Sequence, residues 1–107
     1  MTISHLRTTG RRGTVIELID AVLSDYYLTR ASQDDIAQIN QISPGTVNKI
    51  LDRKYVIYLV DRFSIRRAVT FYWDDEKNET MAYISDHKRD LTWIKRHLKV
   101  GKKLKTD

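Results

Sequence analysis

The stretch that decides the fold is residues 32–53, which read SQDDIAQINQISPGTVNKILDR. Ser32 followed three positions later by Asp35 resembles a capping box, so a helix is predicted to begin at Gln33. Ser43 followed by Pro44 is a second start signal, because proline has no amide hydrogen and its backbone angle suits the first helical position. The stretch is therefore predicted to form two helices joined by a short turn.

Apolar residues recur at helical spacing in this stretch and predict the buried side of each helix. They are Ile36, Ala37 and Ile39 on the first helix, then Val47, Ile50 and Leu51 on the second. Ile42 is expected to fill the corner between the helices. Asn40 is expected to take the left-handed backbone angle of the turn, since asparagine tolerates that angle better than most residues.

A third helix is predicted from about Thr14, as N-cap, to Tyr27 or Leu28. Its apolar positions are Val15, Leu18, Ile19, Val22, Leu23 and Tyr26. Two paired helices cannot bury both of their apolar faces without another element beneath them, so this helix is expected to complete the core.

Length and charge set the class of protein and favour an anionic partner. The 107 residues are expected to form one domain over residues 14–100, with a basic arm over residues 1–13 and a basic tail over residues 101–107. Nineteen Lys and Arg against 14 Asp and Glu give a net charge of +5, which favours nucleic acid. The absence of cysteine excludes disulfides and thiolate metal sites. A cytoplasmic, nucleoid-associated location without a membrane partner is expected, because no apolar run would span a bilayer.

The second half of the chain has the pattern of strands followed by a helix. Residues 55–60 form an apolar run, Val69, Phe71 and Trp73 alternate with other residues, and residues 80–85 form a third run. The polar segment DDEKNE between the last two predicts a hairpin in a small antiparallel sheet. Residues 55–60 are also compatible with an extension of the second helix of the motif. A last helix is predicted from Ser85 or Asp86 to about Val100.

About twenty residues resemble the helix-turn-helix superfamily of prokaryotic and viral DNA-binding regulators. The residues that carry the resemblance are Gln33, Ile36, Ala37, Ile42, Ser43, Thr46, Val47, Ile50 and Leu51. The superfamily often has glycine in the turn, where this chain has Asn40 and Gln41. The resemblance, with the hairpin, implies an α+β winged helix-turn-helix fold with a three-helix core and a C-terminal helix. It also implies a regulator of transcription that is not an enzyme and needs no cofactor.

The resemblance implies that the helix from Pro44 lies in the major groove of double-stranded DNA. Asn48 would bond to an adenine edge and Lys49 to a guanine or a phosphate, with Gly45 and Thr46 on the same short face. Further expected contacts to phosphates are Gln33, Thr46, Arg53, Arg62, Arg66 and Arg67. A homodimer through the C-terminal helix is expected, with Leu91, Ile94 and Leu98 as the apolar contact.

The acidic hairpin leaves other functions open. Asp74, Asp75, Glu76 and Glu79 would repel phosphates, so an RNA-binding or protein-interaction module, with exposed Tyr72 and Tyr83, remains an alternative. A replication or partition initiator of a mobile element is another. Carboxylates at residues 74–76 beside Lys77 would also suit a small metal-dependent nuclease. The three histidines lie in separate segments, so no metal site is predicted.

Overall fold

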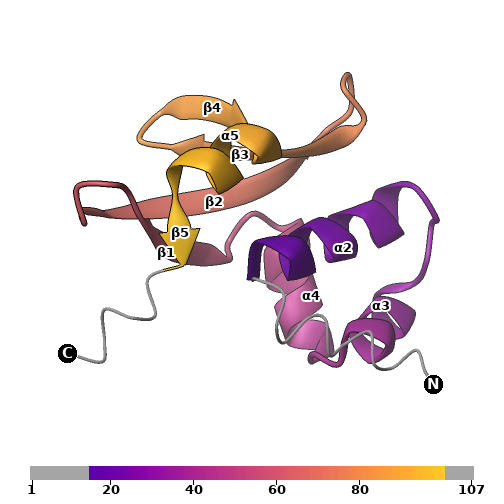
Figure 1. Cartoon of the computed structure of the whole chain (residues 1–107). Helices are drawn as coiled ribbons and strands as arrows, with labels where there is room; N and C mark the ends of the chain where they lie inside the picture. The colour runs from indigo at the N-terminus through magenta and orange to yellow at the C-terminus, as the bar shows by residue number, and fades with distance from the viewer. Residues whose placement is uncertain (1–14, 101–107) are drawn as a thin grey trace. The chain divides into compact units, whose positions relative to one another are not determined.

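The computed structural model describes residues 15–100, and the chain divides into two compact units between Lys54 and Tyr55. The unit that ends at Lys54 is helical, and the unit that begins at Tyr55 is an antiparallel sheet with one helix (Figure 1). The α+β class predicted from the sequence is confirmed. The expected N-cap at Thr14, the basic arm and the basic tail lie outside the described residues.

Over the described residues 15–54, the helical unit consists of α2 (Val15–Tyr27), α3 (Gln33–Asn40) and α4 (Pro44–Leu51). Each of the three helices contacts the other two, as predicted for a three-helix core. The buried apolar residues of the helical unit are Ile16, Ile19, Val22 and Leu23 of α2, Ile36 and Ala37 of α3, and Val47 and Ile50 of α4. Burial of such side chains stabilises the unit by roughly 1.5–3 kcal/mol each.

Serine side chains fix where α3 and α4 begin. The Ser32 hydroxyl accepts a hydrogen bond from the Asp35 amide at 3.1 Å, and the Ser43 hydroxyl accepts one from the Thr46 amide at 3.1 Å. These bonds satisfy amides in the first turn of each helix, and the Thr46 amide also donates to the Ser43 carbonyl at 3.0 Å. Both predicted helix starts are therefore confirmed, with Pro44 as the first residue of α4.

The turn between α3 and α4 differs from the prediction in one residue. Gln41, and not Asn40, takes the left-handed backbone angle, with φ of 57°. The Gln41 amide donates to the carbonyl groups of Ala37 and Gln38, which closes the end of α3. Asn40 stays helical, and its side-chain amide donates to the Ile36 carbonyl at 2.9 Å. The expectation that Asn40 makes the turn was therefore wrong.

On α3 and α4, two residues predicted to be buried lie nearer the surface. Ile39 is 60% exposed, and Leu51 is only half-buried. The buried face of α3 consists of Ile36 and Ala37 with half-buried Asn40, and Ile39 lies beyond the edge of that face. Ile42, expected in the corner of the turn, is half-buried.

Up to Val100, the last described residue, the sheet unit contains five antiparallel strands in the order β4-β3-β2-β1-β5. They are β1 (Val56–Val60), β2 (Arg66–Asp74), β3 (Glu79–Ile84), β4 (His87–Asp90) and β5 (Lys99–Val100). The run after Tyr55 is thus a strand, because α4 ends at Leu51 and Arg53 has a left-handed φ of 62°. The predicted hairpin over residues 74–79 joins β2 to β3.

Helix α5 (Leu91–His97) connects β4 at one edge of the sheet to β5 at the other. Alternation and register place Val69 and Phe71 of β2 on one face together with Ile84 and Ala82 of β3, and all four are buried. Ile94 and Leu98 are buried as well, and α5 lies over the sheet in Figure 1. The helix and this face form the core of the sheet unit.

The predicted C-terminal helix from Ser85 or Asp86 to about Val100 was wrong for residues 85–90 and 98–100. Ser85 and Asp86 have φ of 47° and 72°, a two-residue turn that sends the chain back along β3 as β4. The helix begins only after Asp90, whose carboxylate accepts the Trp93 amide at 2.9 Å. Basic residues Lys88 and Arg89 therefore lie on a strand.

The apolar stripe of α5 is used within the chain. Ile94 and Leu98 are buried, with 0% and 5% exposed, and Leu91 is half-buried. A dimer contact needs apolar side chains that a second copy can reach. Ile94 and Leu98 offer no such surface, so the expected dimer contact through this stripe has no support in the structure.

The two isoleucines of α3 provide a direct test of the helical core. Ile36→Ala is expected to lower the free energy of unfolding by roughly 2–5 kcal/mol, because it leaves a cavity at a fully buried position. The matched control, Ile39→Ala on the exposed side of the same helix, is expected to change it by less than about 0.5 kcal/mol. Chemical denaturation measures both values, and equal losses would contradict the assigned faces.

Candidate nucleic-acid interface

Helix α4 carries an exposed polar stripe on the side opposite its buried residues. Gly45, Asn48, Lys49 and Asp52 are spaced at three and four residues, so they lie along one side of the helix, and all are exposed. Among the described residues, the side chains of Asn48 and Lys49 have no hydrogen-bond or ion-pair partner. The stripe therefore presents the Asn48 amide and the Lys49 ammonium group to solvent, with the Asp52 carboxylate at its C-terminal end. The helix is held by Val47 and Ile50.

The other three residues of the helical unit that were predicted to contact DNA differ in their exposure. The Thr46 hydroxyl lies 3.0 Å from the Ser43 hydroxyl within the cap of α4, and Thr46 is half-buried. Gln33 is the first residue of α3 and is also half-buried. Arg53 is exposed and follows the C-cap residue Asp52, whose carboxylate pairs with Lys54 at 3.4 Å.

Gly45 is not required by the fold. Among the described residues, a Cβ atom built at this position would meet only the Ser43 Oγ at 3.8 Å, an ordinary van der Waals distance. The glycine has no positive φ. Alanine is more favourable than glycine in a helix by up to about 1 kcal/mol. A glycine without a structural role on an exposed helix face suits the close approach of another molecule.

The three predicted phosphate-contact arginines belong to the sheet unit. Arg62 and Arg66 are exposed, and their guanidinium groups lie 4.9 Å and 4.8 Å from the ring centres of Phe63 and Tyr58. Arg67 is half-buried and bonded to the Asp61 carboxylate. Only Arg62 and Arg66 of the three therefore have no carboxylate partner within the described residues.

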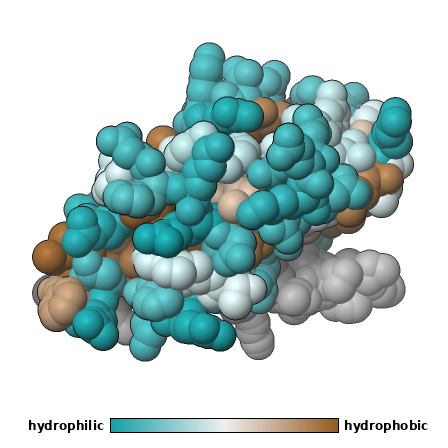
Figure 2. Space-filling model, turned by 90° about the horizontal axis from the view of Figure 1, so that it is seen from above, coloured by the Kyte–Doolittle hydropathy of each residue, from teal (hydrophilic) through white to brown (hydrophobic). Residues whose placement is uncertain are grey.

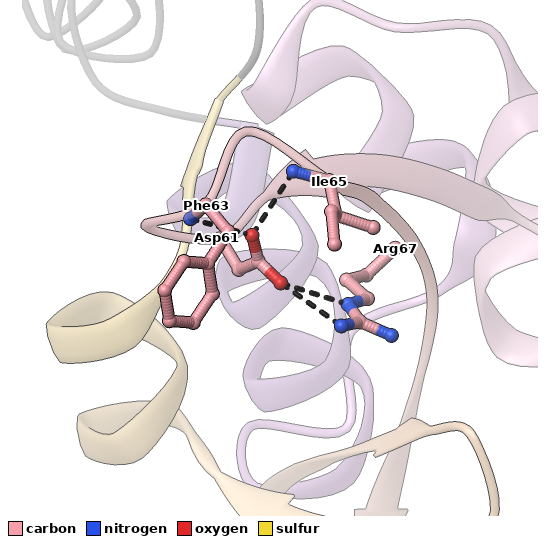
Figure 3. A network of polar contacts seen from close by, with 4 residues as sticks. All are labelled: Asp61, Phe63, Ile65 and Arg67. Atoms are coloured by element: carbon pink, nitrogen blue, oxygen red, sulfur yellow. Dashed lines mark hydrogen bonds and ion pairs between the residues drawn. The ribbon is translucent and has the colours of Figure 1, made fainter.

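Asp61 organises the loop between β1 and β2 (Figure 3). One carboxylate oxygen accepts the amides of Phe63 and Ile65 at 2.8 Å and 3.0 Å. The other oxygen accepts the Arg67 Nε and a terminal guanidinium nitrogen, both at 3.0 Å. The hydrogen bond from the Ile65 amide is the main cause that lowers the pKa of Asp61, and the Phe63 amide and Arg67 lower it further against the effect of burial.

The lowered pKa of Asp61 predicts a pH-dependent contribution to stability. Because the carboxylate is favoured in the folded state, its contribution is present above the ordinary pKa of about 3.9 and is lost as pH falls through the lower folded value. Asp61→Asn is expected to reduce the free energy of unfolding at neutral pH and to flatten its decline between about pH 5 and pH 2. Denaturation curves across this range measure the effect.

Asp75→Asn is the matched control, since Asp75 is exposed on the β2–β3 hairpin and lies outside the loop network. It removes the same charge. An Asp61→Asn curve that follows the Asp75→Asn curve at every pH would contradict the role given to the network.

The acidic hairpin uses one of its carboxylates to close its own turn. The Asp74 carboxylate accepts hydrogen bonds from the amides of Glu76 and Lys77 at 2.9 Å and 3.1 Å, and Asn78 has a left-handed φ of 57°.

Tyr72, expected to be exposed, is buried, and Tyr83 is half-buried and stacked on it at 4.8 Å between ring centres. The pair therefore offers less aromatic surface to an RNA or protein partner than predicted.

The sheet unit also contains a cleft of about 510 Å³ that was not predicted. It lies where the β1–β2 loop, the sheet face and α5 meet, and its lining includes Asp61, Arg67, His87, Arg89, Trp93 and His97. From the sequence, His87 and His97 were expected to lie in separate segments without a shared site. The turn at residues 85–86 puts His87 and Arg89 on the strand face toward α5, so the histidines share the cleft.

Comparison with known proteins gives no match to a protein-family model, to a curated protein or to a solved structure. Figure 2 shows a largely hydrophilic face, on which hydrophobic residues form small separate patches. Within residues 15–100, no helix has the length and apolar character needed to cross a bilayer. In the same residues, no three His, Asp or Glu side chains are grouped so that they would hold a metal ion.

Proposed function

We propose that this chain is a winged helix-turn-helix regulator of transcription that binds double-stranded DNA with α4 in the major groove. The observation that carries the proposal is the exposed stripe of α4. It combines a glycine without a structural role, Gly45, with two side chains that have no partner among the described residues, Asn48 and Lys49. The net charge of +5 supports an anionic partner.

The chemistry of the stripe matches the edges of base pairs. An asparagine amide donates and accepts at once, which is the pattern that the N6 and N7 atoms of adenine require. Lys49 reaches a guanine edge or a phosphate, while Gly45 lets the first turn of α4 approach the groove. Thr46 acts through the cap that it shares with Ser43, and Gln33 and Arg53 contact the DNA backbone.

Arg62 and Arg66 supply further phosphate contacts from the sheet unit, whereas Arg67 stays with Asp61. Regulation then follows from occupancy, because a protein bound over a promoter blocks or guides the polymerase. Binding as a homodimer would give a palindromic site. Such a dimer would use a surface other than the buried Ile94 and Leu98.

Selection from a random duplex pool tests the function, and substitutions in α4 test the residues. The chain is expected to enrich a defined sequence, and Asn48→Ala is expected to cost roughly 1–3 kcal/mol for that sequence and much less for unrelated DNA. Lys49→Gln is expected to weaken binding to both the enriched sequence and unrelated DNA. The control Lys95→Gln, an exposed lysine on α5, removes the same charge. Enrichment of no sequence, or tighter binding to RNA, would refute the proposal.

Gly45→Ala separates stability from binding. The added methyl group has room and favours the helix, so thermal unfolding is expected at an equal or higher temperature, with up to about 1 kcal/mol gained. Binding to the selected duplex is expected to weaken, because the methyl group stands between α4 and the groove. A variant that is no less stable and binds DNA as tightly as the unchanged chain would show that Gly45 makes no close contact.

A further inference from the structure

The cleft of the sheet unit has the shape of a small-ligand site. Its volume of about 510 Å³ lies within the range of pockets that hold one small molecule. Its walls are the β1–β2 loop with Arg62 and Phe63, the sheet face with Arg67 and Arg89, and α5 with Trp93. All of these residues belong to one unit, and none belongs to α4.

The cleft has an excess of positive charge. Arg62, Arg67 and Arg89 line it. Among the described lining residues, Asp61 is the single carboxylate, and it is already bonded to Arg67. Neither Arg62 nor Arg89 forms an ion pair with a described residue, so both guanidinium groups are available to an anion. Arginine binds phosphate with paired, charge-assisted hydrogen bonds, which favours a phosphorylated ligand.

Each of the two histidines of the cleft uses one ring nitrogen in a hydrogen bond to a backbone carbonyl group. His87 Nδ1 lies 3.1 Å from the Ser85 carbonyl oxygen, and His97 Nδ1 lies 2.9 Å from the Trp93 carbonyl oxygen. A carbonyl group only accepts, so Nδ1 of each ring carries the hydrogen. The Nε2 atom of each ring forms no hydrogen bond with a described residue and is left for a ligand.

Aromatic rings lie beside the positively charged side chains of the cleft. The Arg89 guanidinium lies 4.5 Å from the Trp93 ring centre, and the His97 ring stacks on Trp93 at 4.3 Å. Phe63 is 68% exposed on the loop at the same cleft. Exposed aromatic rings next to arginines are the combination on which proteins stack nucleic-acid bases, while the arginines hold the phosphates.

We propose that this cleft binds a single nucleotide, with its phosphate on Arg62 and Arg89 and its base against Phe63. Asp61 acts as a positioning residue, because its bonds to the loop amides and to Arg67 fix the shape of the wall. The nucleotide is either free or part of a single strand, since the cleft has room for one nucleotide and not for a duplex. The proposal does not depend on DNA binding by α4.

Calorimetric titration of the full chain with ADP, inorganic phosphate and adenosine tests the chemistry. ADP is expected to bind more tightly than phosphate or adenosine, because it alone engages both the arginines and the aromatic ring. Arg62→Gln with Arg89→Gln is expected to weaken ADP binding at least about tenfold. The matched control is Lys95→Gln with Arg96→Gln, which removes two charges from exposed residues of α5 outside the cleft lining. This control is expected to bind ADP like the unchanged chain.

A second arm identifies the source of the nucleotide. Oligothymidylate of about five nucleotides is titrated beside ADP. Binding of the oligonucleotide alone, weakened by the cleft substitutions and not by the control, supports a nucleotide within a strand; binding of ADP supports a free one. If the double variant does not fold, Arg62→Gln alone decides, because Arg62 is exposed on a loop. Binding of neither probe, or equal losses in the cleft variant and the control, overturns the proposal.

Discussion

Helices α3 and α4 have eight residues each, too few to be stable as isolated helices in water, so both depend on tertiary burial. Ile36, Val47 and Ile50 supply that burial, and the three helices of the unit contact one another. The same constraint fixes the outer surface, because a short helix with one buried face has its remaining residues in solvent. The exposed stripe of α4 therefore follows from the core, and a cavity at Ile36 would disturb the proposed DNA contacts indirectly.

Hydrogen bonds between short polar side chains and backbone amides determine where α4 begins and how the β1–β2 loop is shaped. Ser43 and Pro44 set the first residue of α4 and so place Gly45 in its first turn. Helical spacing then puts Gly45, Asn48 and Lys49 on one side. In the sheet unit, Asp61 has a comparable role, since one carboxylate holds two loop amides and the Arg67 guanidinium. In both units, a short polar side chain satisfies backbone amides and so positions the residues that face solvent.

The helical unit was predictable because its signals are local. Periodic apolar residues and the serine caps gave α2, α3 and α4 within one or two residues, but the edge of a buried face depends on neighbouring helices, so Ile39 was misplaced. The region after Ile84 was not predictable by spacing. Leu91, Ile94 and Leu98 fit a long helix, whereas left-handed angles at Ser85 and Asp86 create β4. The cleft depends on that turn, so its residues could not be grouped from the sequence.

Amide chemical-shift mapping on the isotope-labelled chain tests the central claim most directly. Addition of the selected duplex is expected to produce the largest shifts at Gly45, Asn48 and Lys49, with smaller ones at Arg62 and Arg66. The amides of α5, such as Lys95 and Arg96, are expected to change little. A map in which α4 is unaffected while other surfaces respond would contradict the account of α4 as the DNA-reading helix.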